Sequence, residues 1–566
     1  MRLKKLFMPM FVGLAFVGCS NGEDFNPGND NETNEDPKYL TVSINTTGTM
    51  TRATTPDGEY EAGTDAENKV TSVRFYFLDE NNAAINVKKS TGENWVNYYD
   101  VDSPNYKGDD MNNVEKILKA TLVIQSQKGD KLPSSIMAVL NPTAELKEKG
   151  SMGLTDLNNF IKDFSTTTTN FLMSNSVYAK DGTKMEAVSV DNHLYTTADA
   201  AEADPVIIHV ERVLAKTRLT VGLTAVTLEN GVKIYKTTKS GTKETETFGG
   251  EDIYVKFLGW NVTATTKKSR LLKEINPAAW KSDLFSNSIL WNTADYCRSF
   301  WAVNPTEIEY KYGDFTNHAQ VIKDFDAGTT ENPKVNYTYL QENASDDYKN
   351  GTDPTTPSQV IIAAQLVNEK GAAMEFAEYA GIRYTIDGLL TKYAELADLW
   401  TVNAAGNGRR QITTDDIKLF TDADEHDNET QKETENRYKV YVKLKDEATI
   451  WYASEDKTDN TPVNANERLK SMGSAKVWKG GNTYYYFEIH HLNGEATAEN
   501  AKGKYGVVRN HVYAANIHSL VGLGTPVYDP EEVIYPEKPG GDDTYIAAEI
   551  RILSWRIVNQ NIDLEW

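Results

Sequence analysis

The residue with the clearest potential for chemistry is Cys19, whose thiol lies where a bacterial lipoprotein signal peptide would end. The chain opens with basic residues, and the apolar run of residues 6–18 is far shorter than the roughly 20 residues of a membrane-spanning helix. Such a run is typical of a cleaved signal peptide. Gly18 precedes Cys19 and a polar tract begins at Ser20, so the sequence predicts removal of residues 1–18 and acylation of the thiol. Two acyl chains would tether the precursor firmly to a membrane. The alternative is an ordinary secretory signal with an incidental cysteine.

Other residues that could carry chemistry do not form a recognisable catalytic or metal-binding pattern. Adjacent histidines such as His490 and His491 point to opposite faces of a strand, and no zinc-binding spacing joins them to His511 or His518. The acidic run of residues 422–427 lacks the glycine and the third ligand of a calcium loop. Cys297, in an apolar stretch, is expected to be a buried hydrophobic residue. We therefore expect no enzyme activity, no catalytic or metal site, and no cofactor.

Composition restricts the compartment and the partners. The chain has 566 residues, 39% of them hydrophobic and 25% charged, which is ordinary for a globular protein with sizeable cores. The net charge is −23, and because the signal peptide would carry off three cations, the mature chain is near −26. An acidic surface argues against nucleic acid as a partner and suits an extracellular protein. With Cys19 acylated, the second of the two cysteines has no disulfide partner.

The pattern of hydrophobic residues predicts many short strands. Residues 20–37 hold almost no apolar side chain and are expected to be a disordered tether. Leu40, Val42 and Ile44 then alternate with polar residues, as in a half-buried strand. Similar β-rich runs follow at residues 70–78, 120–124, 136–140, 206–210, 218–223, 253–258, 360–366, 438–443 and 484–489, whereas helices are expected only at 113–119, 155–164 and 386–399. Short strands at this frequency indicate antiparallel β-sandwiches.

The C-terminal end also reads as strand. After a Pro/Gly-rich segment, two runs place apolar side chains on alternate positions: Ile546, Ala548, Ile550 and Ile552 in the first, and Val558, Ile562, Leu564 and Trp566 in the second. Chain ends fray unless something holds them. This end therefore requires a groove, which either the same chain or a neighbouring molecule supplies.

Several segments together resemble the FimA/Mfa-like fimbrial structural subunits of Bacteroidales, which build type V pili, and the nearest subgroup is the Mfa1-like shaft subunits. The segments, in order, are residues 60–70, 137–142, 210–216, 298–302, 339–343, 505–513 and 522–526. The resemblance spans nearly the whole chain. It implies a mainly β fold of two transthyretin-like antiparallel β-sandwich domains with a few short helices, at residues 53–208 and 209–566, after a propeptide of residues 19–52.

The resemblance also implies a mechanism of assembly. In this family a protease cuts a lipoprotein precursor after an arginine that follows the first strand, and Arg52, before Ala53, is the matching position. The cut would release the lipid and the strand of Leu40, Val42 and Ile44 together. The donor strands of another copy, within residues 544–566, would fill the vacated groove by β-strand addition. The implied partners are other copies in a filament, accessory anchor and tip subunits, and the outer membrane while the chain is lipidated.

Two other functions are compatible with parts of this pattern. A monomeric surface lipoprotein that binds glycans or proteins would share the signal and the acidic surface, but it would keep its lipid and hold its C-terminal strand in its own sheet. A tip adhesin would lack a free donor strand, so the alternating C-terminus favours a shaft subunit. The predicted location is a cell-surface fimbria, with the precursor anchored at the outer membrane.

Overall fold

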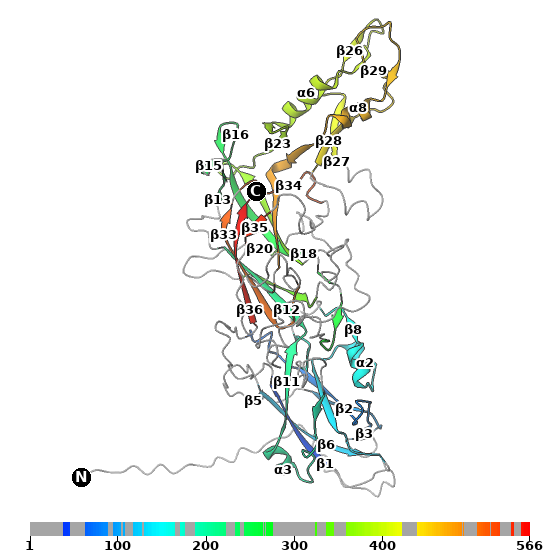
Figure 1. Cartoon of the computed structure of the whole chain (residues 1–566), viewed down its shortest axis with the longest axis vertical. Helices are drawn as coiled ribbons and strands as arrows, with labels where there is room; N and C mark the ends of the chain where they lie inside the picture. The colour runs from blue at the N-terminus through cyan, green and yellow to red at the C-terminus, as the bar shows by residue number, and fades with distance from the viewer. Residues whose placement is uncertain are drawn as a thin grey trace, which may run out of the picture.

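The computed structural model describes an elongated molecule in which three units follow one another along the long axis (Figure 1). The units are an N-terminal unit around strand β1 (Lys38–Asn45), a central unit around strand β33 (His511–Leu520), and an apical unit around helix α6 (Ile386–Ala397). The described residues are 38–45, 63–88, 94–102, 106–107, 117–126, 130–164, 170–175, 187–221, 232–237, 243–263, 265–266, 268–274, 323–324, 336–343, 358–421, 439–489, 491, 506–520, 522–531, 545–547 and 556–565.

The N-terminal unit is built on one sheet with strand order β3-β6-β1-β11-β9-β7-β2-β4. Phe75 and Phe77 of β2 enter a core with β1, β6 and β11, whereas Tyr76 and Leu78 enter a second core with the short helices, so both faces of β2 are buried. The bounds are β2 (Ser72–Leu78), β3 (Val87–Lys88), β4 (Tyr98–Asp102), β5 (Tyr106–Lys107), β6 (Ile117–Ser126), β7 (Ser135–Leu140), α1 (Ala144–Glu148), α2 (Leu154–Asn158), β8 (Ile161–Lys162), β9 (Met173–Asn175), β10 (Val188–Ser189), α3 (Ala198–Ala203) and β11 (Val206–Arg212).

The central unit is a β-sandwich. One sheet has the order β21-β12-β33-β36-β35 and the other β13-β18-β22-β32-β34, and their inner faces share one hydrophobic core. Leu219 and Ile517 reach this core from the first sheet, and Trp260 and Phe487 reach it from the second. The bounds are β12 (Leu214–Val221), β13 (Val232–Lys233), β18 (Tyr254–Thr263), β19 (Ser269–Arg270), β20 (Lys323–Asp324), β21 (Asn336–Gln341), β22 (Gln359–Val367), β32 (Asn482–Glu488), β34 (Thr525–Pro526), β35 (Tyr545–Ala547) and β36 (Arg556–Glu565).

The apical unit is inserted between β22 and β32 and has its own core. Its two ends lie side by side, because Phe376 of β23 (Phe376–Tyr379) pairs with Trp478 of β31 (Ala475–Trp478). Helix α6 begins after Thr385, whose hydroxyl accepts a hydrogen bond from the backbone N–H of Gly388. The other bounds are β24 (Ile382–Tyr384), β25 (Trp400–Val402), β26 (Arg409–Gln411), β27 (Ile417–Thr421), β28 (Lys439–Leu444), β29 (Trp451–Tyr452), β30 (Pro462–Val463), α8 (Ala465–Ser471) and η6 (Lys479–Gly481).

Small hairpins complete the described part: β14 (Tyr235–Thr237) pairs with β15 (Lys243–Thr245), and β16 (Thr247–Phe248) pairs with β17 (Glu251–Asp252). No helix among the described residues has the length and hydropathy that a membrane span requires.

The expected mainly β fold is confirmed, and each predicted strand run contains a strand. The helix predicted at 386–399 is α6. The helix predicted at 113–119 is wrong where it can be followed, because β6 begins at Ile117 and pairs with β1. The helix predicted at 155–164 stops at Asn158, and β8 follows because it pairs with β19. The division into residues 53–208 and 209–566 stays a prediction.

Candidate assembly site

Strand β1 lies inside the N-terminal sheet between two strands that are far away in sequence. It runs antiparallel to β6 along its whole length, from Lys38 opposite Ile124 to Asn45 opposite Ile117. On its other side it runs parallel to β11, with Val42 opposite Val206. Two further backbone hydrogen bonds join Tyr39 to Tyr195, at 2.7 and 2.9 Å. Removal of β1 would therefore split the sheet and leave two rows of unpaired backbone groups.

The side chains of β1 explain why this place has to be filled. Leu40 and Val42 are completely buried in the core between β6 and β11. Thr41 points away from that core, and its hydroxyl lies 3.0 Å from the hydroxyl of Thr121 on β6. Ile44 continues the strand, with its backbone opposite Leu118 and Ile208. An empty β1 position would be an apolar groove with unpaired edges, which in water is costly and accepts another strand.

The two predicted C-terminal runs form a hairpin-like pair in the central unit. β36 runs parallel to β33, from Arg556 opposite His511 to Leu564 opposite Leu520, and β35 lies antiparallel on its outer side. The backbones of Val558 and Ile562 lie within β36, and that of Ile546 within β35. In this single chain the C-terminal strands thus belong to the chain's own sheet. That is also the arrangement expected of a monomeric surface protein.

Several predicted site residues lie outside the described residues. These are Cys19, Arg52, Ala53, Ala548, Ile550, Ile552 and Trp566, together with Cys297, His490 and the acidic run of residues 422–427. Two of the histidines have structural partners: the Nδ1 atom of His491 is 2.8 Å from the hydroxyl of Tyr513, and that of His511 is 2.7 Å from the carbonyl of Arg509. Within the described part of the chain, no group of histidine, cysteine and carboxylate side chains could hold a metal ion.

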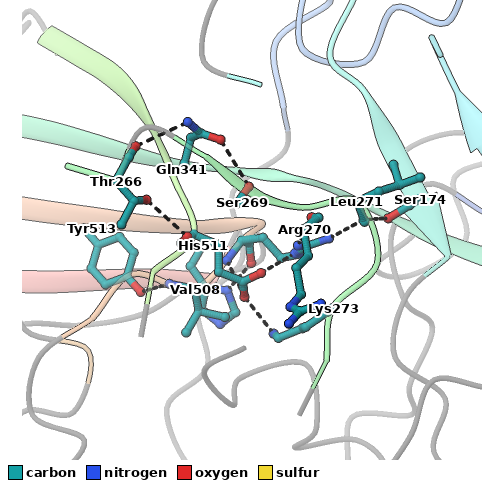
Figure 2. A network of polar contacts seen from close by, with 12 residues as sticks. Ser174, Thr266, Ser269, Arg270, Leu271, Lys273, Gln341, Val508, His511 and Tyr513 are labelled. Atoms are coloured by element: carbon teal, nitrogen blue, oxygen red, sulfur yellow. Dashed lines mark hydrogen bonds and ion pairs between the residues drawn. The ribbon is translucent and has the colours of Figure 1, made fainter. Parts of the chain in front are cut away.

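Between the N-terminal and central units lies a buried polar network that the sequence did not predict (Figure 2). Arg509, with no exposed surface, donates to Glu342 at 2.5 Å and to the carbonyls of Leu271 and Arg270 at 2.8 and 2.7 Å. Lys273 adds a second cation, 3.5 Å from the Glu342 carboxylate. The carboxylate beside the two cations, and the two carbonyls that accept from Arg509, offset part of the cost of burying these charges.

A second network surrounds Arg212, the last residue of β11. Its side chain donates to the side-chain oxygens of Asn68 and Asn510, the latter at 3.0 Å, and to the carbonyl of Glu67 at 3.2 Å. The Glu67 carboxylate is itself completely buried and lies 2.9 Å from the ammonium group of Lys216.

The environment of Glu67 favours its charged form. Burial by itself raises the pKa of this carboxyl, but hydrogen bonds from the Tyr339 hydroxyl and the Thr64 backbone N–H, and the nearby Lys216, together bring the pKa below its ordinary value. Burial, together with the hydrogen bond to Glu67, raises the pKa of the Tyr339 hydroxyl. Glu67 is therefore a buried anion, and the contacts of its carboxylate with Tyr339, Thr64 and Lys216 stabilise the charged form.

Comparison with protein families identifies the C-terminal end of the chain. Residues 476–561 match the family described as "Major fimbrial subunit protein type IV, Fimbrillin, C-terminal". This end is fimbrillin-like. The match runs from within β31 to within β36, so it includes β33, β35 and the first part of β36. It supports a fimbrial subunit of the FimA/Mfa-like kind, whereas the closer likeness to Mfa1-like subunits stays a prediction.

Several solved structures are similar to this chain at low sequence identity and low TM-score. A fimbrilin from Porphyromonas gingivalis W83 is 14% identical, with a TM-score of 0.34, covering 94% of this chain and 98% of that chain. A fimbrial assembly protein from Parabacteroides distasonis is 12% identical, with a TM-score of 0.28 and coverage of 58% and 83%. The tip fimbrial protein Mfa3 from Porphyromonas gingivalis is 11% identical, with a TM-score of 0.27 and coverage of 59% and 80%. No curated protein matches the sequence.

Proposed function

We propose that this protein is a structural shaft subunit of a cell-surface fimbria that supports adhesion, and that it polymerises by exchange of strands between copies. The observation that carries the proposal is the position of β1, an eight-residue strand between β6 and β11 whose Leu40 and Val42 are completely buried. The fimbrillin-like match of residues 476–561, which include most of the C-terminal strands, supports it independently.

In the proposed mechanism, β1 blocks the acceptor groove of its own chain until the connection to β2 is cut after Arg52. The cut separates β1, and with it a lipid on Cys19, from the rest of the molecule. The C-terminal strands of a second copy then take the place of β1. A donor strand in the direction of β1 would run antiparallel to β6 and parallel to β11, and it would again pair both edges of the groove.

The donor strands have to leave the sheet in which the single chain holds them. β35 and β36 are the last two strands in the order β21-β12-β33-β36-β35, so they can separate together without dividing that sheet. The contact that results joins two different surfaces of the subunit, and such a contact produces open filaments rather than closed rings. Anchor and tip subunits would end the filament, and the outer membrane would hold only the uncut precursor.

A monomeric surface lipoprotein that binds glycans or proteins is the second candidate, because β36 pairs with β33 of the same chain. The two candidates differ in what happens to the N-terminus and to the C-terminal strands. A fimbrial subunit loses residues 1–52 and donates its last strands, whereas the monomeric protein loses only residues 1–18 and keeps its lipid and its last strands in place.

The test is electron microscopy of cells that express the wild-type chain, an Arg52→Gln variant, or a chain without residues 545–566. We expect thin surface filaments only with the wild-type chain, and N-terminal sequencing of those filaments should begin at Ala53. Arg468→Gln, which removes a partly exposed arginine from helix α8, is the matched control and should leave filaments intact.

Filaments of normal length from the truncated chain would refute the donor assignment. Filaments whose subunits begin at Cys19 would refute the proteolytic switch. Monomeric, lipid-bound wild-type protein on cells without filaments would favour the glycan- or protein-binding alternative.

A further inference from the structure

A continuous line of strands connects the acceptor groove with the donor strands. β11 forms one side of the place that β1 occupies, and only Val213 separates β11 from β12 in the central unit. β12 pairs in parallel with β33, and β33 pairs in parallel with β36. The covalent crossing from one unit to the other thus lies between Arg212 and Leu214. The pairing of β8 with β19 and the packing of Leu271 against the N-terminal core also hold the units together.

Arg212 fixes that crossing from three directions. Its guanidinium contacts Glu67 and Asn68, which precede β2, and Asn510, which immediately precedes β33. All four residues are buried, and Arg212 itself has no exposed surface. Arginine suits this role, because its planar group presents several donors in a fixed geometry. The contacts connect the end of β11 to the start of β33, the strand that pairs with β36.

The turn before β33 is held on its other side as well. Asn510 has a left-handed backbone with φ of 55°, and its N–H donates to the carbonyl of Leu214 at 2.8 Å. Its neighbour Arg509 binds Glu342 and the carbonyls of residues 270 and 271. That segment pairs with β8 of the N-terminal unit, and the Ser174 hydroxyl donates to the Leu271 carbonyl at 2.8 Å (Figure 2). Arg212 therefore joins the units directly through Asn510, and Arg509 fixes the central-unit segment that pairs with β8.

We infer that Arg212, Asn68, Asn510 and Arg509 form a hinge lock, which keeps the N-terminal and central units at one fixed angle. The role of the lock in a filament rests on the proposed function. There it would hold the acceptor groove of each subunit in line with its donor strands. Pulling force would enter at β11 and leave at β36, and the lock would resist bending where the force crosses between units. In a free monomer the same lock would restrict the interdomain angle.

Asn510→Gly is the discriminating variant. Glycine keeps the left-handed backbone without strain but removes the side-chain oxygen that accepts from Arg212. Asn510→Asp keeps that oxygen, and it also removes the Asn510 amide N–H donors, which have no partner among the described residues. Asn192→Gly is the matched control, because Asn192 also has a left-handed φ, of 66°, but lies exposed in a turn of the N-terminal unit.

The measurement is the distance distribution between spin labels at Lys131→Cys and Leu258→Cys in the full chain, with Cys19 and Cys297 replaced by serine in every variant. Both label sites are exposed, one in each unit. We expect the distribution of Asn510→Gly to be at least about twice as wide as that of the parent. The Asn510→Asp and Asn192→Gly distributions should match the parent. Asn68→Ala, which removes another acceptor of Arg212, should broaden the distribution without altering the turn.

An unchanged distribution in both folded Asn510→Gly and folded Asn68→Ala would overturn the hinge lock. The result is independent of assembly, because it is obtained on monomers. If the parent chain forms no filaments, the proposed function fails and the spin-label result still decides on the lock. If filaments form, images of Asn510→Gly fibres should show a clearly shorter persistence length than those of Asn192→Gly.

Discussion

Two strands, β1 in the N-terminal unit and β12 in the central unit, occupy corresponding places in their sheets. β1 has an antiparallel neighbour, β6, and a parallel neighbour, β11. β12 likewise has an antiparallel neighbour, β21, and a parallel neighbour, β33. Each contributes completely or almost completely buried leucines to its core, Leu40 in β1 and Leu219 in β12.

The difference between the two strands lies in how the chain holds them. β12 continues directly from β11 through Val213, and Lys216 within it pairs with the buried Glu67. Of the strand-to-strand connections in the described part, β1 has only one, to β2 through residues 46–71. One cut in that connection leaves β1 attached by noncovalent contacts alone. Under the proposed function, the same sheet position is permanent in one unit and removable in the other.

The largest predicted effect comes from cutting the chain after β1 in one variant and after β12 in another. A site for a specific protease is placed within residues 46–62 in one variant and within residues 222–231 in another. After the first cut, a labelled peptide of residues 545–566 should replace the β1 fragment, because nothing covalent retains β1. After the second cut β12 should stay, because Val213 still joins it to β11. Native mass spectrometry of the gel-filtered products measures both.

Equal peptide uptake by the two cut proteins would contradict the comparison. The uncut parent, incubated with the same protease and peptide, is the control for binding of the peptide elsewhere. A scrambled peptide of the same composition tests whether alternation of apolar and polar residues is required.

The next effect concerns the matched leucines. Leu40→Ala and Leu219→Ala should each lower the free energy of unfolding of the uncut chain by about 2–5 kcal/mol, the usual range for a buried leucine. Once β1 has been cut and displaced, Leu40→Ala should cost the remaining chain nothing, whereas Leu219→Ala should keep its cost. Urea unfolding before and after the cut measures the difference. A persistent cost for Leu40→Ala would mean that β1 never leaves.

The smallest predicted effect is the pH dependence of the contact that holds β12. The folded-state pKa of Glu67 lies below its ordinary value of 4.5, so between the two pKa values the unfolded chain binds more protons than the folded chain. The stability from this contact is complete above the ordinary pKa and is lost as the pH falls through the folded-state value. Each unit of lowering corresponds to about 1.4 kcal/mol. Glu67→Gln should therefore lose less stability than the parent as the pH falls from 5 to below 4.5.

Urea midpoints measured across that range test the prediction, with the exposed Glu80→Gln as control. If Glu67→Gln and the parent have parallel pH profiles, Glu67 does not contribute through its charge.

The sequence predicted the strands because their side chains alternate over short distances. The run of Leu40, Val42 and Ile44 identified β1, and the alternating C-terminus identified β36. The sequence did not predict the partners of these strands, since β1 pairs with residues about 80 and 165 positions away along the chain. Helix prediction at 113–119 failed for the same reason, because pairing with β1 outweighs local preference.

The networks of Arg212 and Arg509 were also beyond sequence reasoning. The sequence around an arginine in an apolar run does not show whether its side chain is exposed or buried. The partners of Arg212 and Arg509 lie more than 140 residues away along the chain. One signal was available: residues 210–216, 339–343 and 505–513 were singled out by resemblance, and these segments supply most of the two networks. Resemblance marked the positions, but only the structure gave them a common location.

The apical unit enters and leaves the central unit through two paired strands, and its base is fixed by stacked rings of Phe248, Phe376 and Trp478, with centroids 4.8 and 4.9 Å apart. A module attached in this way can change its sequence, or be replaced by another of similar spacing, without altering the sandwich below. A fibre built from such subunits would present one copy of the module per repeat. Ligands that bind a single module weakly would then be retained by avidity along the fibre.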